Sequence, residues 1–309
     1  MSGEVLAGRY RLTARIGEGG HGTVHRAEDL QSGRSVALKL MHREREGAAL
    51  ARFRREAELV QRLSHPNNVR LLDFGVADGE QPYSVFELLE GQSLDEISKT
   101  HGALPHERIV HIATQVLRAL AEAHSVGIVH RDIKPANLFV TQPAGASDFV
   151  KVLDYGIAKS LRENTRALTG PGEVLGTPSY MTPESIEARP TSPASDVYSL
   201  GLVMSELVSG RRVFHGSPID ICLKQVSPSP VPHPPEVLTS PLGPVIARAT
   251  EKRPEDRYAN AAEMLAALAQ PRAGASSATR RSRAWLWIGL GFVLAIALGL
   301  WLAQSTFAG

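Results

Sequence analysis

Hydrophobic and polar residues alternate over much of the first ninety residues, a pattern typical of strands with one buried face. Five strands are predicted, separated by Gly and Asp turn signals: Tyr10–Ile16, Thr23–Asp29, Ser35–Met41, Val69–Phe74 and Tyr83–Leu88. A single helical pattern interrupts them over Ala49–Leu63. Its apolar stripe recurs every three or four positions and consists of Leu50, Phe53, Ala57, Val60 and Leu63. The pattern therefore predicts a β-rich region that contains one helix.

The pattern becomes helical from Ser93 onward. The predicted helices are Leu94–Lys99, Pro105–Val126, Ala194–Ser209, Ile219–Gln225, Gly243–Thr250 and Ala261–Leu268. A small β-rich lobe over about 10–90, followed by a larger helical lobe over about 91–270, indicates an α+β fold and not the alternating units of a doubly wound sheet. The Pro-rich segment Ser227–Pro241 is predicted to be a loop, and no internal repeat is visible.

A long apolar run lies near the C-terminus. Trp285–Ala303 contains 19 residues without a charge, and as a helix it would span about 28 Å, close to the hydrocarbon core of a bilayer. We therefore predict one transmembrane helix over 285–303. A buried core helix is the alternative, but three glycines would weaken it: Gly289, Gly291 and Gly299.

Basic residues predict the orientation of this helix. Three arginines lie just before it, at the end of a juxtamembrane linker over 271–284: Arg280, Arg281 and Arg283. The positive-inside rule then places the region 10–270 in the cytoplasm and leaves 304–309 as a short extracytoplasmic tail. The expected location is the cell (inner) membrane, which the chain crosses once.

Composition excludes some classes of function. The chain has 309 residues, 43% of them hydrophobic and 21% charged, as in a globular protein. Its net charge of +2 creates no overall basic field, so nucleic acid is not an expected partner. The single cysteine, Cys222, cannot form a disulfide within the chain, which suits a reducing compartment, and we interpret it as a small buried hydrophobe.

A glycine-rich run of the form G-x-G-x-x-G-x-V connects the first two predicted strands. The run consists of Ile16, Gly17, Glu18, Gly19, Gly20, His21, Gly22, Thr23 and Val24. Glycines allow backbone N–H groups to approach phosphates without interference from a Cβ atom. A dinucleotide-binding turn shares this spacing but must begin a helix, whereas a strand follows here. The run therefore predicts a phosphate-binding hairpin, with a plain glycine-rich hairpin as the alternative.

A lone lysine, Lys39, lies within an apolar strand and needs a partner, because an unpaired buried charge is very costly. Glu56 lies close to the apolar stripe of the predicted helix and is the natural partner. Glu58 is the competitor, but it is expected on the polar face of that helix. We therefore predict an ion pair between Lys39 and Glu56.

The residues with the most specific chemistry lie in the middle of the chain. They form two motifs 17 residues apart, His130-Arg131-Asp132-Ile133-Lys134-Pro135-Ala136-Asn137 and Asp154-Tyr155-Gly156. If the predicted strands Leu138–Val140 and Phe149–Leu153 pair as a hairpin, Asn137 and Asp154 come together at its open end. An amide oxygen and a carboxylate are suitable hard ligands for Mg²⁺. The motifs therefore predict a site with a proton acceptor, a phosphate-binding lysine and a metal site.

With these motifs the chain resembles the eukaryotic-like (Hanks-type) serine/threonine protein kinases of bacteria from about Tyr10 to about Gln270. The resemblance implies the bilobal protein kinase fold and transfer of the γ-phosphate of ATP to Ser and Thr hydroxyls of proteins. It implies ATP as substrate and Mg²⁺, or Mn²⁺, held by Asn137 and Asp154. In that family Asp132 accepts or orients the substrate hydroxyl, and Lys134 neutralises charge on the γ-phosphate. The Lys39–Glu56 pair would hold the α- and β-phosphates.

The same resemblance extends to the segment between the lobes. Phe86 would be the gatekeeper, and the backbone of Glu87 and Leu89 would contact the adenine. Two residues depart from the family pattern. Tyr155 replaces the usual Phe of D-F-G, so its ring should keep the packing while a buried phenol needs a hydrogen-bond partner. Asn68 stands where an aliphatic residue is usual and is expected to cost some packing.

The later residues resemble the activation segment of the family, which would run from Asp154 to Glu184 and end in a G-T-P-x-Y-M-x-P-E run. The resemblance implies an ion pair between Glu184 and Arg257. It also implies that Asp196 braces the catalytic loop, residues 130–137, through backbone hydrogen bonds, and that Thr177 contacts this loop at Asp132 and Lys134. An ordinary surface charge or cap is the alternative for each residue taken alone.

Regulation follows from the same resemblance. In related kinases an arginine beside the catalytic aspartate, here Arg131, receives a phosphorylated residue of the activation loop. Thr169 is the first candidate for that residue and Thr165 the second. The alternative is an ordinary loop threonine, with Arg131 paired to local carboxylates.

The leading hypothesis is thus an active, membrane-anchored serine/threonine kinase. A pseudokinase that acts as a membrane-tethered scaffold is an alternative, but such proteins usually lack one of four residues that this chain retains: Lys39, Asp132, Asn137 and Asp154. A small-molecule kinase would not be expected to carry the run 176–184. Protein substrates are the expected partners, and a homodimer of kinase domains is a candidate route to autophosphorylation.

Overall fold

The computed structural model describes residues 3–19, 22–43, 47–78, 80–142, 148–155 and 178–270. The chain divides into two units, Met1–Ala269 and Gln270–Gly309, and all of the elements below belong to the first unit.

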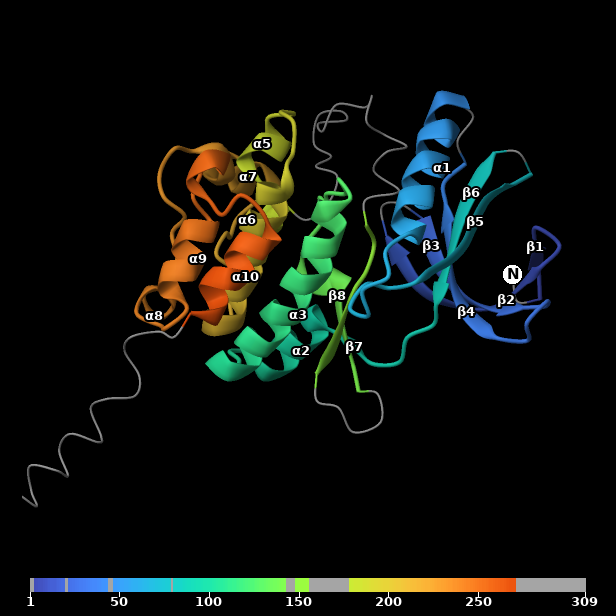
Figure 1. Ribbon diagram of the computed structural model, residues 1–309, viewed down its shortest axis with the longest axis horizontal. Helices are drawn as coiled ribbons and strands as arrows, with labels where there is room; N and C mark the ends of the chain where they lie inside the picture. The colour runs from blue at the N-terminus through green and yellow to red at the C-terminus, as the bar shows by residue number, and fades with distance from the viewer. Residues whose placement is uncertain are drawn as a thin grey trace, which may run out of the picture. The chain divides into compact units, whose positions relative to one another are not determined.

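The N-terminal part is a six-stranded antiparallel sheet (Figure 1). Its strands in sheet order are β1 (Val5–Leu6), β2 (Tyr10–Gly19), β3 (Gly22–Asp29), β4 (Ser35–Met41), β6 (Gln81–Glu87) and β5 (Leu71–Ala77). Alternation sets the inner face of each strand, as Val36 and Leu38 on β4 are buried while Ser35 is exposed. The buried side chains on this face form one core cluster that includes Tyr10, Leu12 and Val85.

Helix α1 (Gly47–Gln61) lies beside this sheet (Figure 1). Its buried residues are Ala49, Phe53, Ala57 and Val60, at the spacing of one helical face. The ring of Phe53 meets that of Phe74 on β5 edge to face, with 6.2 Å between centroids. The predicted stripe is therefore confirmed in its centre, but Leu50 is only half-buried because Ala49 occupies the innermost position.

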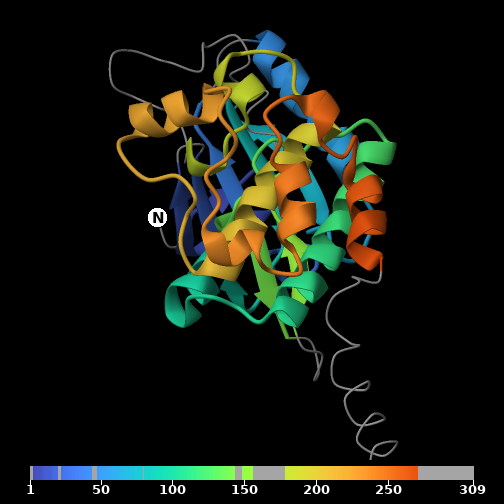
Figure 2. The ribbon, with the colours of Figure 1, turned by 90° about the vertical axis from the view of Figure 1, so that its left-hand side faces the viewer.

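Helices dominate the remainder of the unit. The yellow and orange ones gather on the side away from the six-stranded sheet in Figure 1, the side that faces the viewer in Figure 2. They are α2 (Leu94–His101), α3 (His106–Ser125), α5 (Pro183–Ile186), α6 (Pro193–Ser209), α7 (Pro218–Val226), α8 (Pro235–Leu238), α9 (Gly243–Ala249) and α10 (Ala261–Ala269). Every residue of α6 from Ala194 to Val208 is buried, so this helix is the centre of the helical part. The predicted α+β class is confirmed.

A second, three-stranded sheet carries the central motifs. Its order is β7 (Gln92–Ser93), β8 (Leu138–Thr141) and β9 (Phe149–Val152). Strands β8 and β9 pair antiparallel with Leu138 opposite Val152 and Thr141 opposite Phe149. The predicted hairpin is thus confirmed, and its open end lies directly beside Asn137 and Asp154.

Some elements differ from the prediction for identifiable reasons. Strand β5 begins at Leu71 rather than Val69, because Asn68 bridges to Val152 and the Val69 N–H donates to the Val152 carbonyl at 3.0 Å. The predicted Pro-rich loop contains the short helix α8, which begins with Pro235 in the first turn, where proline is tolerated. The two-residue strands β1 and β7 are too short to produce an alternation pattern.

In the ranges that the structure describes, no helix combines the length and apolar character needed to cross a bilayer. The predicted transmembrane segment 285–303 lies outside those ranges.

Candidate active site

A cavity of about 310 Å³ is lined by residues of both sheets and of the segment that connects β6 to β7. This volume is near the lower end of the range for small-molecule sites, roughly 300–1,000 Å³. Five lining residues were predicted to bind ATP: Ile16, Val24, Lys39, Glu87 and Leu89. The predicted gatekeeper Phe86 and metal ligand Asp154 also line it. The other lining residues were not predicted from the sequence: Arg26, Ala37, Val69, Leu88, Phe139 and Leu153. Alternation could have indicated Arg26 and Ala37, which are two residues from Val24 and Lys39 along their strands.

The glycine-rich hairpin closes where Gly19 pairs with Gly22. Gly22 has a φ of +137°, and a Cβ atom there would lie 2.1 Å from the Leu40 carbonyl oxygen. Only glycine fits this position, because the backbone of β4 is too close for any side chain. Gly17, Glu18 and Thr23 lie in the paired strands, whereas residues 20 and 21, Gly20 and His21, are outside the described residues.

The partner of Lys39 differs from the prediction. Its Nζ atom donates to Asp154 Oδ1 at 2.7 Å, and no ion pair joins Lys39 to Glu56, two residues that the structure describes. The predicted Lys39–Glu56 pair is therefore wrong for this structure. Helical spacing placed Glu56 near the inner face of α1. It carried no information on the distance from Lys39 to Asp154, because the position of Asp154 depends on a left-handed backbone conformation with φ +55°.

Electrostatics keep Asp154 ionised. Burial alone would raise the pKa of its carboxyl group, but the adjacent Lys39 ammonium outweighs that effect and lowers the pKa below its ordinary value. Asp154 and Arg131 are both non-glycine residues with positive φ, +55° and +64°, a strain that functional sites often retain.

The catalytic loop brings the predicted residues Asp132, Lys134 and Asn137 together. Lys134 Nζ and Asn137 Nδ2 each donate to Asp132 Oδ2 at 2.8 Å. Asn137 Nδ2 also donates to the Asp132 carbonyl at 2.8 Å, so its amide nitrogen is the atom used for this contact. The amide oxygen of Asn137 is consequently the end that can serve as a metal ligand.

His130 links this loop to Asp154. Its Nε2 lies 2.7 Å from the Leu153 carbonyl, which can only accept, and its Nδ1 lies 3.2 Å from the Asp132 N–H, which can only donate. The ring must therefore be neutral, with its proton on Nε2. Burial, which lowers the pKa of His130, agrees with this state. The ring thereby fixes the position of Leu153, the residue before Asp154, relative to the backbone of Asp132.

Asp196 on α6 braces the catalytic loop as predicted. Its two carboxylate oxygens accept the backbone N–H groups of His130 and Arg131, each at 2.8 Å. His124 Nε2 also lies 2.9 Å from Asp196 Oδ2, a contact that was not predicted from the sequence. Because the carboxylate binds two successive amides, it holds the strained backbone at Arg131.

The predicted ion pair between Glu184 and Arg257 is present. Two parallel bonds of 2.8 and 2.9 Å join the guanidinium to the carboxylate, and both residues are almost wholly buried. Burial would raise the pKa of Glu184, but Arg257 outweighs it and the pKa is lowered.

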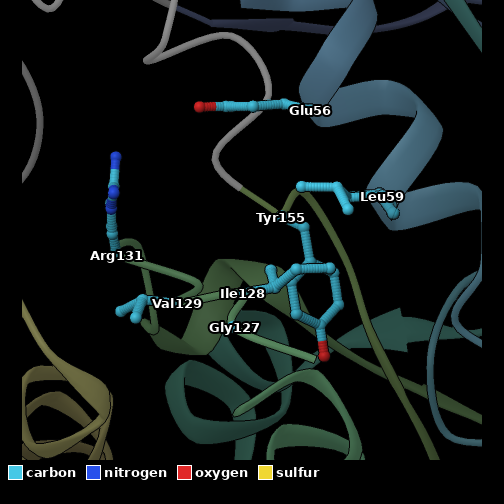
Figure 3. A pocket seen from close by; sticks show the side chains of 8 residues that line it. Glu56, Leu59, Gly127, Ile128, Val129, Arg131 and Tyr155 are labelled. Atoms are coloured by element: carbon cyan, nitrogen blue, oxygen red, sulfur yellow. The ribbon is translucent and has the colours of Figure 1, made fainter. Parts of the chain in front are cut away.

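A second, smaller cavity of about 90 Å³ lies between α1 and the catalytic loop (Figure 3). Glu56 and Arg131 reach into the same space, and the ring of Tyr155 forms part of the wall while its hydroxyl points away from them. That Glu56 and Arg131 line one cavity was not predicted from the sequence. The predicted regulatory residues Thr169 and Thr177 lie outside the described residues.

The chemistry of these groups fits a magnesium ion that is shared with a phosphate. Among the described residues, no cluster of three or more His, Cys, Asp or Glu side chains could hold a metal alone. The Leu153 N–H donates to the Asn137 carbonyl at 2.9 Å, which keeps Asn137 close to Asp154. Mg²⁺ commonly takes one or two protein oxygens and completes its coordination with substrate phosphates and water.

The comparisons with known proteins agree with this geometry. Residues 10–267 match the family described as the protein kinase domain. The chain is 38% identical over 292 residues to the serine/threonine-protein kinase pkn3 of Myxococcus xanthus, a match that covers 91% of this chain and 53% of that protein. It is 37% identical over 273 residues to the serine/threonine-protein kinase PknB of Mycobacterium tuberculosis, covering 85% of this chain and 43% of that protein.

A probable serine/threonine-protein kinase of Corynebacterium efficiens gives a similar result, with 39% identity over 278 residues that cover 85% of this chain and 41% of the relative. The chain thus spans about half the length of the curated relatives it matches or less. The matched region contains every residue of the site described above, and the chain belongs to the protein kinase family.

Proposed function

We propose that this chain transfers the γ-phosphate of ATP to serine and threonine hydroxyls of proteins. The observation that carries the proposal is a group of five side chains. Lys39 and Asp154 pair with each other and line the 310 Å³ cavity. Lys134 and Asn137 both contact Asp132, and the Asn137 carbonyl accepts the N–H of Leu153, the residue before Asp154. Phosphoryl transfer needs a positioned hydroxyl and neutralised phosphate charge more than it needs covalent chemistry from the protein.

Each group has a role that its geometry supports. Asp132 is oriented by Lys134 and Asn137 and would accept the proton of the acceptor hydroxyl. Lys134 is close enough to that carboxylate to contact the phosphate being transferred, and Lys39 would bind the phosphates that stay behind. When bound between Asn137 and Asp154, Mg²⁺ would neutralise phosphate charge.

The direct test is incubation of the purified full-length chain, in detergent, with γ-labelled ATP and Mg²⁺. We expect label on Ser or Thr, and we expect Lys39→Met and Asp154→Asn each to lower incorporation by roughly a hundredfold or more. Equal incorporation by the unchanged chain and both variants would contradict the proposal.

We further propose that the segment 285–303 anchors the chain in the inner membrane with its kinase domain in the cytoplasm. The support is the 19-residue uncharged run and the arginines that precede it. The full-length chain should sediment with membranes and require detergent for release, whereas a chain ending at Arg283 should remain in the supernatant. A full-length chain that stays soluble without detergent would contradict the anchor.

We also propose that the chain phosphorylates its own activation loop within a homodimer of kinase domains. Arg131 is an exposed residue of the catalytic loop, next to Asp132, where a guanidinium can receive a phosphate. Thr169 is the expected acceptor, with Thr165 second. Phosphopeptide mapping of the labelled product decides this point, and active protein without a modified residue between Lys159 and Gly176 would exclude it.

A further inference from the structure

The two residues that depart from the family pattern, Tyr155 and Asn68, contact each other. Both are buried, with 3% and 4% of their surface exposed. The Tyr155 hydroxyl donates to Asn68 Oδ1 at 2.5 Å, across a separation of 87 residues in sequence. Asn68 is therefore the hydrogen-bond partner that the buried phenol of Tyr155 was expected to need.

The direction of this hydrogen bond is fixed by its surroundings. Asn68 Nδ2 donates to Glu122 Oε2 at 2.9 Å and to the Ala119 carbonyl at 3.3 Å, and both of these groups can only accept. The amide oxygen of Asn68 must therefore face Tyr155. Burial raises the pKa of Tyr155 well above its ordinary value, so the phenol keeps its proton and donates it.

Glu122 on α3 accepts the last hydrogen bond of the series that starts at Tyr155, and further hydrogen bonds hold it in place. Its carboxylate also accepts the N–H and hydroxyl of Ser64 at 2.8 Å and the N–H of His65 at 2.9 Å. Burial would raise the pKa of Glu122, but these bonds and the one from Asn68 outweigh it and lower the pKa. The series Tyr155, Asn68, Glu122 thus ends on a charged group, which strengthens hydrogen bonds to it.

This series of hydrogen bonds restrains the backbone next to Asp154, the residue before Tyr155. Asp154 holds a strained backbone conformation with φ +55°, and the Tyr155 ring packs on His130 with 4.6 Å between centroids. The ring also lines the cavity of about 90 Å³ (Figure 3). Packing against a cavity leaves room for a ring to move, whereas a hydrogen bond on the far side of the ring restricts it to one position.

We propose that Tyr155 and Asn68 are positioning residues that hold Asp154 in the orientation required for the magnesium–nucleotide complex. This inference rests on the proposed function, because it concerns the same site. Loss of either hydrogen-bonding group lowers the fraction of molecules with Asp154 correctly placed. Apparent affinity falls in proportion to that fraction.

The test is a double-mutant cycle with Tyr155→Phe, Asn68→Leu and the combined variant. The measurement is the Mg²⁺ concentration that half-saturates binding of a fluorescent ATP analogue to the full-length chain. Each single variant leaves a buried polar group without its partner, and we expect each to raise that concentration about tenfold. The combined variant removes both polar groups and should return to within about threefold of the unchanged chain.

Tyr198→Phe is the matched control. The Tyr198 hydroxyl donates to the buried amide oxygen of Gln225, also at 2.5 Å, but between α6 and α7. This variant should lower the melting temperature as Tyr155→Phe does, and it should leave the Mg²⁺ dependence unchanged.

Three results would overturn the inference: an unchanged Mg²⁺ dependence in both single variants, additive effects in the combined variant, or an equal shift in Tyr198→Phe. A chain that binds the nucleotide but transfers no phosphate would instead defeat the proposed function, and the binding cycle would still decide the positioning role. Failure of the unchanged chain to bind the magnesium nucleotide would overturn both.

Discussion

Replacement of Asp132 by Asn should lower the rate of phosphate transfer by about 10³-fold, within the range of roughly 10²–10⁴ for a positioned acid–base group. The substitution keeps the size of the side chain and an oxygen that can accept from Asn137 Nδ2, now 2.8 Å from Asp132 Oδ2. It removes the negative charge and with it the ability to take a proton. Since Asp132 does not line the nucleotide cavity, the dissociation constant for ATP should stay within about threefold.

The measurement is single-turnover transfer from labelled ATP to a protein acceptor, with binding of a fluorescent ATP analogue measured in parallel. Asp95→Asn is a matched control, because Asp95 also pairs with a lysine, Lys99 at 2.6 Å, but on α2. The control should transfer phosphate at the normal rate. A normal rate in Asp132→Asn would exclude Asp132 as proton acceptor, and a loss of transfer matched by an equal loss of ATP binding would show that the defect is not in the chemical step.

The sequence predicted the elements whose patterns are regular. Strand β4 has the bounds predicted from its alternation, Ser35–Met41, because one of its faces is buried and the other is not. The hairpin of β8 and β9 was also predicted, and with it the approach of Asn137 to Asp154. In each case the information is local, since it lies in the side chains of one strand or of two strands joined by a short connection.

The sequence could not predict contacts that depend on exact backbone placement. The helical pattern offered Glu56 and Glu58 as partners for Lys39. The actual partner is Asp154, 115 residues away in sequence and in a backbone conformation with positive φ that no local pattern indicates. Tyr155 and Asn68 were each recognised as unusual, but nothing in the sequence shows that their side chains meet. The ion pair of Glu184 with Arg257 also joins residues far apart in sequence, 73 positions, and was predicted only because the motifs around both residues resemble a known family.

That ion pair carries the second large expected effect. Glu184→Gln should lower the free energy of unfolding by about 3–5 kcal/mol, the usual cost of removing one partner of a buried pair. The cost arises because the Arg257 guanidinium, 2% exposed, remains buried without a counter-charge. Its bonds to the Glu251 and Lys252 carbonyls, at 2.7 and 2.9 Å, hold it in place, so it cannot move to solvent without breaking them.

Denaturant unfolding of the full-length chain in detergent measures this effect, with Glu236→Gln as the control. Glu236 pairs with Arg211 at 2.9 Å, but both side chains are about half exposed, so the same substitution should cost less than about 1 kcal/mol.

The stabilisation by this ion pair depends on pH with a definite sign. Arg257 lowers the pKa of Glu184 below its ordinary 4.5, so the stabilisation is complete above about pH 4.5 and is lost as the pH falls through the lowered pKa. The difference in unfolding free energy between the unchanged chain and Glu184→Gln should therefore be constant near neutral pH and shrink in acid. A difference below about 1 kcal/mol at neutral pH would mean that the buried pair does not anchor α5 to the segment that carries Arg257.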